Sequence, residues 1–107
     1  MDLKQNCGLS DAIHQDLQQV FSQFPQIEQV LIFGSRAKGS YREGSDIDLA
    51  VFAPAMTDSE FTTLWAHVDS VPIFFKIDLI HWNTLEKEAL KQKILAEGHV
   101  FYKGHLA

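Results

Sequence analysis

Two aspartates one residue apart, Asp46 and Asp48, begin an apolar stretch that ends at Phe52. Because side chains alternate along a strand, both carboxylates should lie on one side, with their Cα atoms about 6.6–6.8 Å apart. Two carboxylates this close repel each other and resist joint ionisation. A divalent cation removes that penalty, and Mg²⁺ prefers one or two carboxylates together with phosphate oxygens. The pair therefore predicts a magnesium site.

A phosphate-binding turn is predicted just upstream of the aspartates. Gly34 and Ser35 follow the apolar stretch "VLIF". Glycine lets the backbone turn and lets a ligand come close, and serine offers a hydroxyl and a backbone N–H. A short helix starting there would add an N-terminus that favours anions. A metal site beside a phosphate cradle is a layout for phosphate transfer.

The spacing of these two motifs resembles a known signature. Gly34-Ser35, ten further residues and then Asp46-x-Asp48 is similar to the signature of the DNA polymerase β nucleotidyltransferase superfamily. The whole stretch "FGSRAKGSYREGSDIDLAVF" resembles its small prokaryotic branch, the minimal nucleotidyltransferase (MNT) domains. That family carries a third carboxylate between apolar neighbours on a later strand, and "FKIDLIHW" supplies Asp78 there. The resemblance covers most of the chain.

The resemblance implies a role for each matching residue. Asp46 and Asp48 would bind magnesium, with a nucleoside triphosphate as co-ligand. By analogy with relatives, that triphosphate would be ATP. Asp78 would share a metal and help to deprotonate the attacking hydroxyl. Gly34 and Ser35 would hold the β- and γ-phosphates. The reaction would be in-line attack of an acceptor hydroxyl on the α-phosphorus, with pyrophosphate leaving.

Plainer interpretations stay open for several of these residues. Asp46 and Asp48 alone could be a solvated strand edge after a turn, and Asp78 could simply pair with Lys76. Arg36 directly follows the Gly-Ser pair. It could contact the triphosphate, or it could tie the loop to a carboxylate such as Asp46.

Apolar patterning predicts the elements that would position these residues. Apolar or alternating runs predict strands over residues 28–33, 46–52 and 74–82 and a short final strand over 99–102. Helical spacing and capping patterns predict three helices: one between Ser10 and Pro25, one from the "TDSE" box to about Val68, and one from Asn83 to just before Gly98.

This order indicates an α/β protein built on a small sheet. Ile47, Leu49 and Val51 should face a helix, opposite to the aspartates. Strand directions do not follow from the residues alone. The resemblance implies a small mixed β-sheet flanked by helices, the polymerase β-type nucleotidyltransferase fold.

Composition narrows the class of protein. At 107 residues, the chain should form a single domain spanning residues 1–107. No stretch approaches the roughly 20 apolar residues of a membrane span, and no signal peptide is predicted. A single cysteine, Cys7, fits a reducing cytoplasm. The net charge of −5 argues against nucleic acid as a direct ligand, and the five histidines lack zinc-ligand spacing.

Three functions follow as hypotheses. The chain has little beyond the catalytic fold, so the resemblance implies that a partner supplies the acceptor. In that family the partner is a helical HEPN protein, and the two form a toxin–antitoxin pair. A non-catalytic module that binds a nucleotide or a HEPN protein is the second hypothesis, although binding alone does not need three carboxylates. Transfer to a small molecule such as an aminoglycoside is the third, and a homo-oligomer is possible with any of them.

Overall fold

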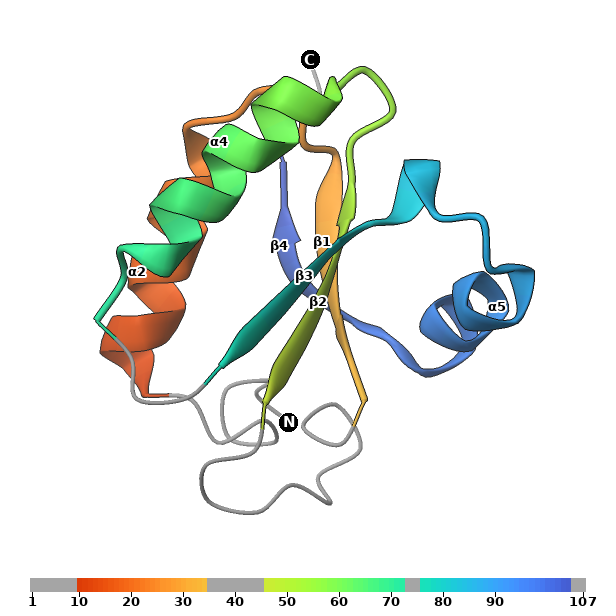
Figure 1. Ribbon diagram of the computed structural model, residues 1–107. Helices are drawn as coiled ribbons and strands as arrows, with labels where there is room; N and C mark the ends of the chain where they lie inside the picture. The colour runs from red at the N-terminus through yellow and green to blue at the C-terminus, as the bar shows by residue number, and fades with distance from the viewer. Residues whose placement is uncertain (1–9, 35–45, 73–75, 105–107) are drawn as a thin grey trace.

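The computed structural model describes residues 10–34, 46–72 and 76–104. Its strands form one mixed sheet in the order β3-β2-β1-β4 (Figure 1). The strands are β1 (Gln29–Phe33), β2 (Ile47–Phe52), β3 (Ile77–His81) and β4 (His99–Lys103). β1 runs antiparallel to both β2 and β4, whereas β2 and β3 are parallel. The mixed sheet implied by the resemblance is confirmed.

Helices cover both faces of this sheet (Figure 1). Two of them, α2 (Asp11–Ser22) and α4 (Asp58–Asp69), lie on one face, and α5 (Glu88–Glu97) lies on the other. A short 3₁₀ turn, η1 (Trp82–Thr84), connects β3 towards α5. In the part of the chain that the structure describes, no helix is long and apolar enough to cross a bilayer.

Side-chain alternation in β2 divides the core between the two faces. Ile47, Leu49 and Val51 are fully buried in the cluster that includes Leu17 of α2 and Leu64 of α4. Their predicted orientation towards a helix is confirmed. The alternate residues of the strand, Ala50 and Phe52, pack in a second cluster with Ile94 of α5. Asp48 is two positions before Ala50, so its side chain lies on the same face of the sheet, the α5 face.

The first two helices begin where the sequence predicted. The Ser10 hydroxyl accepts a hydrogen bond from the Ile13 N–H at 3.2 Å. At α4, Thr57 and Glu60 form a reciprocal capping box, with each side chain accepting from the other's backbone N–H. These caps satisfy N–H groups that have no partner within the helix.

The predicted start of the third helix is wrong. α5 begins at Glu88, and its N-cap residue Lys87 makes no side-chain cap. The Asn83 carboxamide oxygen instead accepts from the Ala53 backbone N–H at 2.7 Å, which ties η1 to the end of β2. The side chain therefore makes a long-range hydrogen bond in place of the predicted local helix cap. The predicted end is confirmed, because Gly98 is the C-cap residue of α5.

Candidate functional site

Three strand ends meet at the end of the sheet that carries the aspartates. The antiparallel pairing places Phe33, the last residue of β1, opposite Asp48. The parallel pairing places Asp48 level with Asp78. Neighbouring strands lie about 4.8 Å apart, and paired side chains point to the same side. Two of the predicted ligands, thirty positions apart in the sequence, therefore become direct neighbours on the α5 face.

Gly34 lies directly against the Asp48 carboxylate. Its φ of +79° is a left-handed conformation that glycine adopts without steric cost. A Cβ at this position would collide with Asp48 Oδ2. Both the backbone turn and the close approach of the carboxylate thus require glycine here.

The electrostatics of Asp48 match the repulsion expected from the sequence. Burial raises the pKa of the Asp48 carboxyl, and the nearby charges of Asp78 and Asp46 raise it further. The ammonium groups of Lys93 and Lys76 partly offset this rise. A cation held between these carboxylates would favour their ionised forms.

Asp78 also has the partner that the plainer interpretation named. Lys76 Nζ lies 3.6 Å from Asp78 Oδ1, and the two side chains are 69% and 43% exposed. An ion pair this exposed contributes about 0–1 kcal/mol. Such a weak tie leaves the Asp78 carboxylate free to exchange the lysine for another cation.

The donors suit magnesium, although they do not form a preassembled metal site. Carboxylate oxygens are the hard ligands that Mg²⁺ prefers. Within residues 10–34, 46–72 and 76–104, no three His, Cys, Asp or Glu side chains already stand as a metal-binding group. Asp48 and Asp78 are in register, and the exposed Asp46 directly precedes β2. The two remaining predicted site residues, Ser35 and Arg36, lie outside the described residues.

Sequence reasoning missed the contribution of Lys93. This lysine belongs to α5, which packs on the same sheet face as Asp48 through Ile94. Its positive charge lowers the pKa of Asp48 and so offsets part of the rise caused by burial and the neighbouring carboxylates. Nothing in the local sequence indicates this, because forty-five positions separate Lys93 from Asp48 and only the docking of α5 brings them together.

A family model described as "Polymerase beta, Nucleotidyltransferase" matches residues 15–105. A search of curated protein sequences finds no significant match. Six solved chains match significantly.

Three of these solved structures show the same fold. A toxin–antitoxin structure with AMP-PNP is 22% identical, with a TM-score of 0.62 over 84% of this chain and 73% of its own. A mutant of the toxin–antitoxin MntA-HpeT is 19% identical, with a TM-score of 0.61 over 84% and 72%. A Sulfolobus solfataricus protein, by name a nucleotidyltransferase, is 24% identical, with a TM-score of 0.58 over 94% and 83%.

The family match spans the glycine turn and all three aspartates, which the fold gathers at one end of the sheet. It confirms the resemblance seen in the sequence, and the similar structures agree with the mixed sheet and its helices. The chain therefore belongs to the polymerase β nucleotidyltransferase family, and its class of enzyme is nucleotidyltransferase.

Proposed function

We propose that this protein transfers a nucleoside monophosphate, AMP from ATP, to a hydroxyl group on a partner protein, with magnesium as the cofactor. The partner is a HEPN-type toxin, and the protein acts in the cytoplasm as its antitoxin. The observation that carries the chemistry is the juxtaposition of Asp48 and Asp78, with Asp48 seated against Gly34. Two adjacent carboxylates beside a glycine turn suit a metal–triphosphate complex.

Each residue has a defined task in this reaction. Asp46 and Asp48 would hold the magnesium, which neutralises charge on the triphosphate. Gly34, Ser35 and Arg36 would hold its phosphates, and Gly34 also makes room for the Asp48 carboxylate. The acceptor oxygen forms a bond to the α-phosphorus. The bond between the α-phosphorus and the oxygen that bridges it to the β-phosphate breaks, and pyrophosphate leaves. Asp78 takes the hydroxyl proton, since its carboxylate is part-exposed and only weakly paired.

The similar structures support the substrate and the partner. One contains AMP-PNP, an adenine nucleotide analogue, and two are toxin–antitoxin structures. The MntA-HpeT mutant replaces two aspartates by glutamate, two positions apart. Asp46 and Asp48 have the same spacing. A toxin partner would also provide the acceptor hydroxyl.

The test is label transfer from α-³²P-ATP to a candidate HEPN protein in the presence of magnesium. Wild type should label the partner, and Asp48→Asn should reduce the rate by about 10²–10³-fold, the usual effect of removing a preorganised electrostatic group. The control, Asp69→Asn, removes an exposed carboxylate at the end of α4 and should label normally.

Other outcomes would replace the proposal. Tight binding of the partner without any labelling would indicate a non-catalytic binding module. Labelling of an aminoglycoside but not of the protein would indicate a small-molecule acceptor. Labelling that survives Asp48→Asn would refute the assignment of the site.

A further inference from the structure

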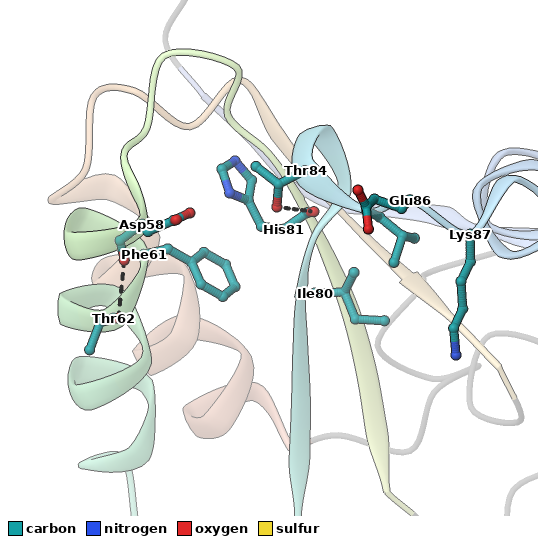
Figure 2. Close-up of a pocket in the computed structure, with 9 residues that line it drawn as sticks. Asp58, Phe61, Thr62, Ile80, His81, Thr84, Glu86 and Lys87 are labelled. Atoms are coloured by element: carbon teal, nitrogen blue, oxygen red, sulfur yellow. Dashed lines mark hydrogen bonds between the residues drawn. The ribbon is translucent and has the colours of Figure 1, made fainter.

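A pocket lies at the other end of β3 from the aspartates (Figure 2). Its volume is about 500 Å³, within the roughly 300–1,000 Å³ of ligand pockets. His81, in its wall, is three residues beyond Asp78, or about 10 Å along the strand. The lining residues come from α4, β3 and the segment before α5: Asp58, Phe61, Thr62, Ile80, His81 and residues 84–87. None of them belongs to the aspartate site described above.

Among the described residues, one hydrogen-bonding atom of the His81 ring has no partner. The side chain is only 6% exposed. Its Nε2 lies 2.8 Å from the Ala53 carbonyl oxygen, and since a carbonyl only accepts, Nε2 donates. In the uncharged ring Nδ1 can then only accept, and this buried atom has no partner among the described residues. A donor in the pocket would satisfy this nitrogen once a neighbouring side chain shifts enough to let it approach.

Among the described polar side chains that line the pocket, the two hydroxyls already donate within the protein, and the Lys87 ammonium is the remaining donor. The Thr62 hydroxyl donates to the Asp58 carbonyl oxygen at 3.0 Å, and the Thr84 hydroxyl donates to the His81 carbonyl oxygen at 3.3 Å. The carboxylates of Asp58 and Glu86 can accept. In Figure 2 the Asp58 carboxylate points towards His81, whereas the Lys87 side chain extends away. The pocket therefore favours a cationic group rich in donors.

We infer that this pocket receives an arginine side chain of a partner protein. A guanidinium group has five N–H donors in one plane and no acceptor. It also stacks on aromatic faces. The Phe61 ring lines the pocket and is only partly buried, while its other side packs on His81, with ring centres 5.1 Å apart and planes 13° from parallel. Ile80 and Leu85 offer apolar surface for the methylene groups.

Charge complementarity favours a protein partner of this kind. The chain as a whole carries a net charge of −5, which attracts a basic surface. The pocket opens beside β3, an edge strand of the sheet, where a partner can approach. The inference goes beyond nucleotidyl transfer, because arginine binding here uses none of the aspartates of the catalytic site and can be tested without nucleotide.

The test is an NMR titration of the ¹⁵N-labelled protein with the blocked tripeptide acetyl-Gly-Arg-Gly-amide. Saturable shifts should occur at the amides of Thr62, Thr84 and Leu85. The matching citrulline peptide, which keeps the shape but lacks the charge, should bind at least about tenfold more weakly, a difference of about 1.4 kcal/mol. The double variant Asp58→Asn/Glu86→Gln should lose the shifts.

A second double variant, Asp16→Asn/Asp69→Asn, removes two exposed carboxylates outside the pocket and should bind as wild type does. If both double variants lose peptide binding equally, the binding depends only on the net charge of the protein, and the inference is overturned. Equal binding of the citrulline peptide would indicate an apolar groove. Absence of saturable shifts, or binding of spermidine in place of the arginine peptide, would likewise refute an arginine pocket.

Discussion

Asp48 lies half-buried at the start of β2, level with Asp78 on β3 and seated against Gly34. Burial and two neighbouring carboxylates disfavour its charged form. The same surroundings suit a divalent cation, because a cation reverses the sign of both effects. The Asp48 carboxylate therefore lowers the stability of the metal-free protein, and a bound divalent cation would restore that stability.

The first prediction concerns Asp48 and stability. Because its pKa is raised above the ordinary 3.8, the folded state binds more protons than the unfolded state between 3.8 and the folded pKa. The free energy of unfolding should fall as pH rises through that window, and the loss should persist at neutral pH. Asp48→Asn should therefore stabilise the magnesium-free protein at pH 7 and flatten this dependence. Urea unfolding from pH 4 to pH 8 measures both.

Asp69→Asn is the matched control, since it removes an exposed carboxylate and should leave the pH dependence unchanged. Magnesium should stabilise wild type more than Asp48→Asn. If Asp48→Asn lowers the free energy of unfolding at pH 7, the charged form is not penalised in the folded protein.

At the scale of elements, α5 contributes to the aspartate site from the opposite end of the sequence. Ile94 anchors this helix on the sheet face that carries Asp48. Lys93 is the next residue to that anchor, and its charge acts on Asp48. The helix thus covers part of the core and also supplies a cation beside the carboxylates.

Lys93→Met should raise the pKa of Asp48 further, because one of the two charges that lower it is lost. The measurement is a ¹³C NMR titration of the Asp48 carboxyl carbon. Lys91→Met is the control on the same helix, since the Lys91 ammonium lies over the Trp82 ring at 4.3 Å. An unchanged titration in Lys93→Met would show that α5 does not influence the site.

Another element-level prediction concerns the link between η1 and β2. Asn83→Ala would leave the N–H of the fully buried Ala53 without its acceptor. The cost should be about 1–3 kcal/mol, measured by urea unfolding. Asn83→Asp keeps an oxygen in the same place and should recover most of the loss. Equal destabilisation by both variants would mean that the hydrogen bond does not matter.

At the scale of the whole molecule, two clusters of apolar side chains hold the sheet between its helices. The aspartates lie at one end of that sheet and the proposed arginine pocket at the far end of β3. An arginine side chain in the proposed pocket would therefore leave the aspartates uncovered.

The core prediction uses a pair of leucines. Leu49→Ala empties a fully buried position next to Asp48 and should cost about 2–5 kcal/mol of unfolding free energy. Leu95→Ala changes a side chain that is 50% exposed and should cost far less. Thermal and urea unfolding of both variants measure the difference. Similar losses in the two would show that the leucine contacts inside the sheet do not dominate stability.

The sequence by itself determined the elements and most of the candidate site. Periodicity located the four strands and three α-helices found in the described residues, since burying one face imposes a fixed repeat on each kind of element. Ser10 and Thr57 marked two helix starts correctly, because a cap is a contact between near neighbours. The glycine turn and the aspartate pair are also local, so their spacing could be recognised.

Tertiary structure decided what depends on contacts between distant residues. The pairing of Asp48 with Asp78 required a parallel register that no local pattern encodes. Asn83 left its predicted cap for Ala53, and Lys93 reached Asp48 only through the docking of α5. His81 Nδ1, which has no hydrogen-bond partner in the described part of the chain, likewise owes its burial to packing. Sequence spacing specifies which groups are present, whereas the sheet and the helices on it decide which of them meet.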